Sequence, residues 1–203
     1  MKTTDILLVM LPVILWPVSF ILLRSAFIYA LLASTFVLAS ISLAYYGKTI
    51  VWKRSKGAIA PVAAGLAGAA ILYLIFYGGN FAVSYFGIAG LVGNVYAMIY
   101  GNVARAQLVV LLAFIGLFEE IYWRGALQSY VRANSKLLRG FPWVATTAYY
   151  TLVHISALNP ILVVAAFFVG LVTSLMAERY GIISSIAAHI VWIELIVVFL
   201  PVL

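Results

Sequence analysis

Two adjacent glutamates and two histidines stand inside stretches of sequence that are otherwise almost entirely apolar. Glu119 and Glu120 are two of only five acidic residues, and His154 and His189 are the only histidines in the chain. Ionisable side chains are costly in hydrocarbon and are therefore functional candidates by default. A carboxylate held away from bulk water can act as a general base toward a water molecule, and a neutral imidazole can share that water or donate a hydrogen bond to a developing oxyanion. The set suits hydrolysis.

A second chemistry stays open for the same residues. Two imidazoles and one carboxylate can hold Zn²⁺ with one position left for water, so Glu119, His154 and His189 are also candidate metal ligands. The residue types do not choose between a metal and a directly activated water. Because the chain contains no cysteine, a Cys-based metal site, a Cys nucleophile and a disulfide framework are excluded.

Arg124 is the natural partner of one of the two glutamates. It follows Glu120 by one helical turn, so the two side chains face the same way and can pair. Glu119 points about 100° away around the helix and remains free for other work. The alternative is that Arg124 holds both glutamates purely as packing.

The composition places these residues in a membrane protein. Hydrophobic residues make up 67% of the 203 positions and charged residues 8%, a balance that cannot cover a soluble core with polar surface. The net charge of +7 does not indicate nucleic-acid binding, because the basic residues stand in short clusters between apolar runs. We expect one all-α domain, 1–203, built as a polytopic transmembrane helical bundle of about seven spans, eight being possible. The expected spans are 6–23, 26–46, 58–77, 106–128, 142–158, 160–177 and 181–200.

The distribution of Lys and Arg predicts the topology. Short loops rich in these residues stay in the cytoplasm, and two clusters qualify. They are Lys48, Lys53, Arg54 and Lys56 in the first loop, and Arg132, Lys136 and Arg139 in the second. If both loops are cytoplasmic, an even number of spans separates them, and the glycine-rich segment 78–104 then does not cross the membrane. This segment could form a re-entrant segment or a surface helix, and an eighth span is the alternative. The protein is then expected in the cell membrane with its N-terminus in the cytoplasm.

Under this topology the polar residues reach similar depths. Glu120 and His154 lie about 18 Å from the cytoplasmic ends of their helices, and His189 lies about 12 Å in. Three separate helices therefore bring carboxylate and imidazole together. Four of the five tryptophans are assigned to aromatic belts or helix packing rather than to chemistry. They are Trp16, Trp52, Trp143 and Trp192.

Three motifs in this half of the chain resemble those of one family. FEEIYWRG at 118–125 resembles the first motif of the CAAX-protease and bacteriocin-processing family of intramembrane proteases, which has two glutamates, three variable residues and an arginine. YYTLVHISALNP resembles the second motif, an aromatic residue four positions before a histidine, here Tyr150 and His154. GLVTSLMAERYGIISSIAAHIVW resembles the closing stretch. Its matching positions are Gly170, Glu178, Arg179, Gly181 and His189. The resemblance covers about residues 110–195, which would carry the catalytic core.

The resemblance implies a role for each matching residue. Glu119 would activate the water, with Glu120 and Arg124 as its support. His154 would help to hold the water or a metal, and His189 would be a ligand or an oxyanion donor. Members of this family include endopeptidases that remove the last three residues from prenylated CAAX proteins.

Two positions depart from the family pattern, and two aromatics are candidate substrate contacts. The second motif begins with Tyr150 rather than the usual Phe, and Ile193 stands where the family often has Asn or Asp. Glu194 is a poor substitute because it is offset by about 100° on the helical wheel. Tyr150 and Trp123 are the candidates for contacting the substrate, and for Trp123 ordinary packing is an equal alternative.

The function favoured by these patterns is intramembrane proteolysis. The expected partners are a peptide or lipid-modified protein substrate and the lipid bilayer, with a site that opens to the cytoplasm and no nucleic acid involved. Zn²⁺ is an open possibility as cofactor. The alternatives are a catalytically silent protein that binds a peptide or confers immunity, and a proton-linked transporter, since buried carboxylates and histidines also form proton relays.

Overall fold

The chain folds into a bundle of helices, and no strand occurs in the part of the chain that is described. The computed structural model describes residues 3–54, 57, 59–101 and 103–202. The α-helices are α1 (Thr3–Pro17), α2 (Phe27–Tyr46), α3 (Ile59–Tyr85), α4 (Ala89–Tyr100), α5 (Arg105–Glu120), α6 (Gln128–Asn134), α7 (Pro142–Val153), α8 (Pro160–Tyr180) and α9 (Ile182–Glu194). Three π-helical segments extend them, η1 (Val18–Leu22), η4 (Ile121–Leu127) and η6 (Leu195–Phe199), and three 3₁₀ turns lie between them, η2 (Arg24–Ala26), η3 (Gly47–Thr49) and η5 (His154–Ala157). The all-α prediction is confirmed.

Six helices within the described residues are long and apolar enough to cross a membrane. They are Thr3–Leu22, Arg24–Thr49, Ile59–Tyr85, Arg105–Asn134, Pro160–Tyr180 and Ile182–Phe199. The seventh expected span, 142–158, is shorter than predicted. Its α-helix, α7, has 12 residues and gives way to a 3₁₀ turn at His154. A histidine is therefore placed where a helix ends inside the bundle.

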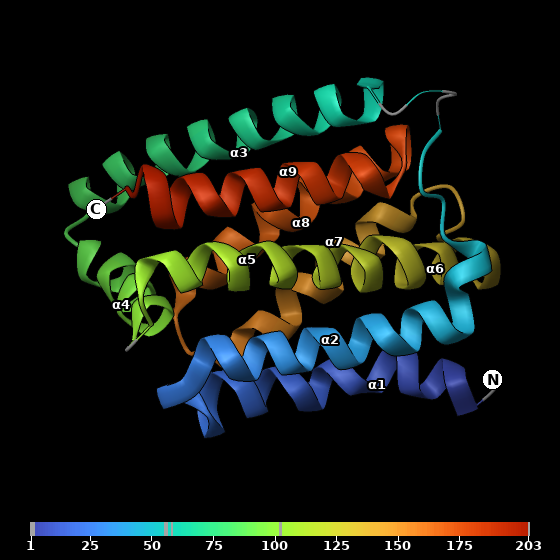
Figure 1. The fold of residues 1–203 in the computed structure, drawn as a ribbon, viewed down its shortest axis with the longest axis horizontal. Helices are drawn as coiled ribbons and strands as arrows, with labels where there is room; N and C mark the ends of the chain where they lie inside the picture. Colours follow the sequence, from blue (N-terminus) through green and yellow to red (C-terminus); the bar gives the residue numbers. More distant parts are fainter. Residues whose placement is uncertain (1–2, 55–56, 58, 102, 203) are drawn as a thin grey trace.

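The glycine-rich segment 78–104 does not return along the bundle. α3 continues past the expected end at 77 to Tyr85, and the chain then turns at Gly87, whose positive φ of 70° suits glycine. The short α4 that follows lies at one end of the bundle beside the C-terminus (Figure 1). Within the described residues, segment 78–104 does not form the additional membrane span that the sequence left open.

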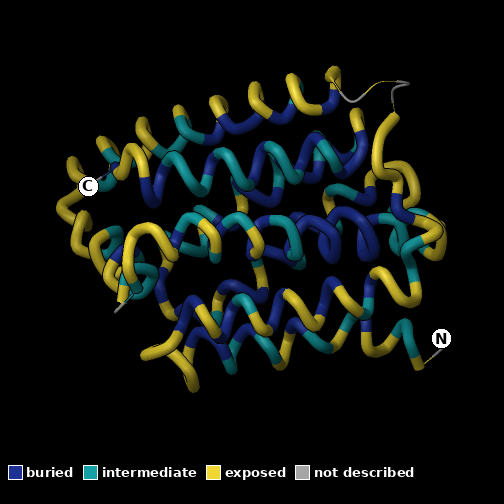
Figure 2. The backbone as a smooth tube through the Cα atoms, in the orientation of Figure 1, coloured by how far each residue is buried: buried dark blue, intermediate teal, exposed yellow. Residues whose placement is uncertain are grey.

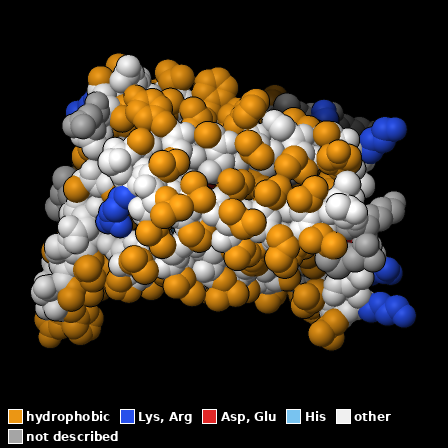
Figure 3. Space-filling model, turned by 90° about the horizontal axis from the view of Figure 1, so that it is seen from below, with side chains coloured by type: hydrophobic (Ala, Val, Ile, Leu, Met, Phe, Trp, Pro, Cys, Tyr) orange, Lys and Arg blue, Asp and Glu red, His pale blue; other side chains and the backbone are white. Residues whose placement is uncertain are grey.

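The two basic loops lie at the same end of the bundle. The N-terminus, the connection from α2 to α3 and the connection from α6 to α7 meet at the end opposite α4 and the C-terminus (Figure 1). On one long face of the molecule, hydrophobic side chains are spread along the whole length, and most of the visible Lys and Arg side chains lie at that end (Figure 3). Of the basic residues named from the sequence, Lys56 lies outside the described residues. The arrangement agrees with an even number of crossings between the two loops.

Buried residues follow the inner faces of the helices (Figure 2). Many large apolar side chains are exposed. α3 packs closely against α9. A Cβ at Gly65 would lie 2.6 Å from both the Ala187 Cβ and the Ser184 carbonyl oxygen, so only glycine fits there. Small residues of this kind let helix backbones approach closely in lipid. This contact sets α9, and with it His189, against the interior.

Candidate active site

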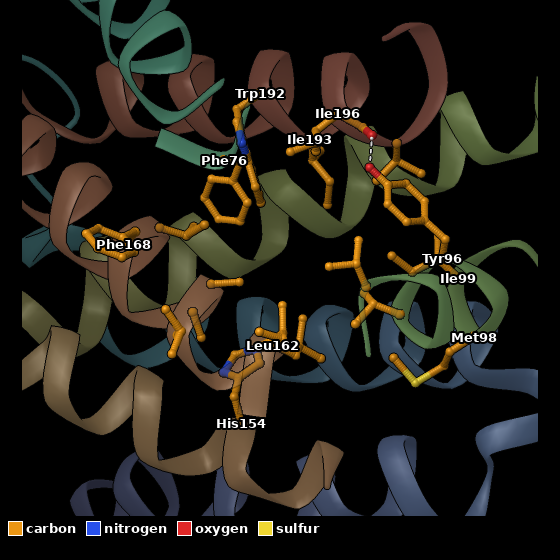
Figure 4. Close-up of a pocket in the computed structure, with 18 of the residues that line it drawn as sticks. Phe76, Tyr96, Met98, Ile99, His154, Leu162, Phe168, Trp192, Ile193 and Ile196 are labelled. Carbon is orange, nitrogen blue, oxygen red and sulfur yellow. Dashed lines mark hydrogen bonds between the residues drawn. The ribbon is translucent and has the colours of Figure 1, made fainter. Parts of the chain in front are cut away.

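A cavity of about 250 Å³ opens between α2, α3, α4, α8 and α9. Its walls are mainly aliphatic and aromatic, with His154 on the side opposite Trp192 (Figure 4). Four of the side chains selected from the sequence border it: Glu119, Tyr150, His154 and His189. Three segments that are separate in sequence, α5, α7 with η5, and α9, therefore contribute polar groups to one apolar chamber.

Glu119 lies at the end of α5, where the helix widens into the π-helical segment η4. π-Helical turns inside α-helices are frequent at functional sites because they shift the register of the side chains that follow. Glu119 is 4% exposed, and its Oε2 accepts a hydrogen bond of 2.8 Å from the hydroxyl of Tyr150. Tyr150, which stands where the family usually has Phe, thus contacts the carboxylate of Glu119 directly. The other oxygen of that carboxylate, Oε1, takes no part in this hydrogen bond.

Glu120 is fully buried and has two cationic or potentially cationic partners. Arg124 Nη1 donates to its Oε1 at 3.0 Å, as the one-turn spacing predicted. His189 Nδ1 lies 2.8 Å from the same oxygen. Arg124 also donates from Nε to the Ser174 hydroxyl at 3.3 Å, and its guanidinium carbon lies 4.7 Å from the centre of the Tyr150 ring. The guanidinium therefore links both glutamates, one directly and one through the tyrosine.

His154 has partners at both ring nitrogens. Its Nδ1 lies 2.7 Å from the carbonyl oxygen of Tyr150, and its Nε2 accepts a hydrogen bond of 3.3 Å from the indole N–H of Trp16. Trp16 comes from α1 and is wholly buried in the core, so the prediction of helix packing is confirmed and the aromatic-belt alternative is wrong; its hydrogen bond to His154 was not predicted. No pattern in the sequence pointed to it, because α1 is far from the motifs along the chain.

The described part of the chain contains no group of three or more His, Asp or Glu side chains that could hold a metal ion. The metal set considered from the sequence, Glu119, His154 and His189, does not converge as donors. The Nδ1 of His189 is paired with Glu120, and the Nε2 of His154 is occupied by Trp16. In this arrangement the three residues do not fit a metal centre.

Three further residues named from the sequence have different surroundings. Ile193 borders the cavity, so an aliphatic side chain lies where the family often has a polar one. Glu194 is not among the cavity residues, and both of its carboxylate oxygens are buried without a hydrogen-bond partner within the described chain. Trp123 is fully buried and is likewise not among the cavity residues; its ring stacks edge-on against Trp16 and Tyr150, at 5.5 and 5.1 Å between centroids.

A column of polar side chains connects this site to the basic end of the bundle. Arg132 and Gln128 both donate to the carboxylate of Glu178 near the end of α8. Gln128 also donates to the Ser174 carbonyl at 3.3 Å, and the Ser174 hydroxyl accepts from Arg124. Ser174 and Gln128 are both buried. The ion pair at the surface and the buried pair at the site are joined by continuous hydrogen bonds.

Gly181 explains how α9, the helix that carries His189, begins. Its φ of 90° favours glycine, and a Cβ there would lie 2.5 Å from the Lys53 Cα. The extended segment that contains Lys53 then satisfies the start of α9, because Ile182 and Ile183 donate their backbone N–H groups to the carbonyls of Val51 and Trp52 at 2.9 and 3.0 Å.

Comparison with known proteins agrees with the three motifs. Residues 101–193 match the family described as Type II CAAX prenyl endopeptidase Rce1-like. The matched segment runs from just before α5 into α9, so it includes every candidate catalytic residue but not α1, α2 or α3. No curated protein and no solved structure gave a significant match. The resemblance inferred from the sequence is confirmed.

Proposed function

We propose that this chain, whose residues 101–193 belong to the Rce1-like family of type II CAAX prenyl endopeptidases, hydrolyses a peptide bond of a membrane-associated substrate with Glu119 as the general base. The observation that carries the proposal is the convergence of Glu119, His154 and His189 on one cavity from three separate helices. Packing alone would not require three costly polar groups to border an otherwise apolar chamber.

The proposed reaction starts from a water molecule beside Glu119. The carboxylate takes one proton from the water while the water oxygen forms a bond to the carbonyl carbon of the scissile peptide. The carbonyl oxygen becomes an oxyanion, which then collapses as the C–N bond breaks. The proton held by Glu119 passes to the leaving nitrogen, so that an amine and a carboxylic acid are released. Tyr150 holds one oxygen of the base in place by its hydrogen bond to Oε2.

His189 is proposed to stabilise the oxyanion. Its Nδ1 lies 2.8 Å from the carboxylate of Glu120, and the proposed role uses the doubly protonated imidazole. In that form Nε2 also carries a proton and can donate it as a hydrogen bond. Because Ile193 offers no donor, the oxyanion role depends more heavily on His189 than it would with Asn or Asp at that position. Glu120 and Arg124 then act as support for His189 and for the base.

The substrate class proposed is a prenylated or otherwise lipid-modified C-terminal peptide. An apolar cavity next to a hydrolytic set suits a substrate that brings its own hydrocarbon into the bilayer. We also propose that the end that carries the N-terminus and both basic loops faces the cytoplasm, in the cell membrane, because Lys and Arg in short loops are retained there. The polar column that includes Gln128 and Ser174 connects that end to the site.

The test is cleavage of a farnesylated CAAX peptide by purified protein in lipid nanodiscs. Glu119→Gln should abolish cleavage, because an amide cannot accept the proton, and should leave the helical content unchanged. Glu194→Gln is the matched control. Glu194 also lies in a membrane-spanning helix but is not among the cavity residues, so this variant should cleave the peptide at the wild-type rate.

Cleavage that persists in Glu119→Gln would remove the assignment. A wild-type protein that binds the peptide without turnover would favour the silent peptide-binding alternative, to which Ile193 in the cavity wall lends support.

A further inference from the structure

His154 has no free acceptor in this structure. The carbonyl oxygen of Tyr150 can only accept a hydrogen bond, so Nδ1, at 2.7 Å from it, must carry the proton. A neutral imidazole then has one lone pair, at Nε2. That lone pair receives the indole N–H of Trp16, a group that can only donate, at 3.3 Å.

The helix that carries Trp16 is fastened to the catalytic helices next to the site. Pro12 has no backbone N–H, so the carbonyl of Leu8, four residues earlier, lacks its partner within α1. The hydroxyl of Tyr122 in η4 donates to this carbonyl, and the hydroxyl of Tyr149 in α7 donates to the carbonyl of Val9. Tyr149 immediately precedes Tyr150, and Tyr122 lies two residues before Arg124. The position of Trp16 is therefore tied to the same elements that carry the candidate active site.

Packing holds the Trp16 ring edge-on to the rings of His154 and Trp123. Its centroid lies 5.8 Å from that of His154 with an angle of 75° between the rings, and 5.5 Å from that of Trp123 with an angle of 86°. Trp16 is wholly buried, and Phe20, one turn further along the chain, contacts His154 at 5.7 Å between centroids. The indole N–H cannot turn to water instead, so its donation to Nε2 is the resting arrangement.

We propose that Trp16 is a latch on the active site: its indole N–H occupies the one acceptor of His154 until the attacking water replaces it. The proposal rests on the proposed function, in which His154 helps to hold that water. One lone pair cannot accept fully from the indole and from the water together, so the two compete. At 3.3 Å the indole bond lies beyond the usual range for N–H donors, so the exchange is only weakly opposed. The residue that regulates the site comes from α1, outside the matched segment 101–193.

The contact itself can be tested by ¹⁵N NMR, because the chain contains only two histidines. Protein labelled with ¹⁵N-histidine in nanodiscs should give one ring with a protonated Nδ1 and a hydrogen-bonded, unprotonated Nε2. In Trp16→Phe the Nε2 signal of that ring should move toward the position of a free acceptor, and the His189 signals should stay where they are. A wild-type spectrum that shows a protonated or unbonded Nε2 on His154 would overturn the latch without any variant.

The kinetic consequence separates a latch from a merely structural tryptophan. Trp16→Phe keeps an aromatic ring but removes the donor, so kcat on the farnesylated peptide should rise by up to about fivefold with KM unchanged, the ratio that corresponds to a hydrogen bond of about 1 kcal/mol. Trp143→Phe, at the partly exposed start of α7, is the control and should leave both constants unchanged.

A folded Trp16→Phe variant with lower kcat would overturn the latch, since that result means that the indole supports rather than blocks His154. The proposed function is judged by a different variant. Loss of cleavage in Glu119→Gln together with a slower Trp16→Phe would sink the latch alone, whereas cleavage by Glu119→Gln would sink the proposed function.

Discussion

Removing the arginine at the centre of the site should destabilise the protein far more than removing a similar arginine at its surface. Arg124 and Glu120 have side chains with 0% exposure, and Nη1 and Oε1 are 3.0 Å apart. When one partner of a buried ion pair is removed, the other charge stays in a medium that solvates it poorly, at a cost of about 3–5 kcal/mol. Arg124→Met keeps most of the side-chain volume, so the charge is the main change. Out of a typical total stability of about 5–15 kcal/mol, this loss is severe.

Arg132→Met is the matched control within the same chain. Arg132 pairs with Glu178, but the two side chains are 37% and 25% exposed, so water and salt can replace the partner. Such partly exposed pairs contribute less than about 1 kcal/mol. The measurement is reversible unfolding by SDS in mixed micelles, followed by far-UV circular dichroism, for wild type and both variants.

The result that would refute this reasoning is equal destabilisation by Arg124→Met and Arg132→Met. Burial would then not be the reason why the Glu120 pair matters. A double variant, Glu120→Gln with Arg124→Met, adds a second check. It removes both charges and should be more stable than Arg124→Met alone, because no buried carboxylate is left without its arginine.

Three further outcomes are expected. Cleavage should survive treatment with EDTA and with 1,10-phenanthroline, because the described donor groups do not converge on a metal; full loss of activity that Zn²⁺ restores would contradict this geometry. Tyr122→Phe should lower the free energy of unfolding by about 1–3 kcal/mol, because the carbonyl of Leu8 that Pro12 exposes then has no donor, and combining it with Pro12→Ala should recover much of the loss in the same SDS titration. Gly65→Ala should destabilise the contact of α3 with α9 by about 1–3 kcal/mol, whereas Gly78→Ala, with open space around its Cβ, should be neutral or stabilising; equal effects in thermal melts would show that the close approach is not required.

The ionisable residues that border the cavity were identifiable from the sequence, because their polarity contrasts with that of their neighbours along the chain. Hydrocarbon makes ionisable side chains costly, so Glu119, His154 and His189 stand out against apolar neighbours without knowledge of the fold. The pairing of Glu120 with Arg124 also follows from local geometry, since residues four apart on a helix share a face. Hydropathy and the 20-residue length of a span likewise predict an all-helical membrane bundle.

The partners of those residues across the bundle were decided by the tertiary structure. Hydropathy does not report how each helix is rotated about its own axis, and this rotation directs His189 to Glu120 and Tyr150 to Glu119. The position where a helix ends inside the bundle is equally hidden, and it places His154 on a 3₁₀ turn.

Trp16 shows the difference most clearly. By its type and position it suits an aromatic belt, and nothing within four residues of it along the chain indicates a histidine partner. Its donation to His154, 138 positions away, exists only because α1 packs against η4 and α7. The sequence alone determines which side chains are too polar for their surroundings. Contact between such side chains depends on helix rotation and packing, which are properties of the whole bundle.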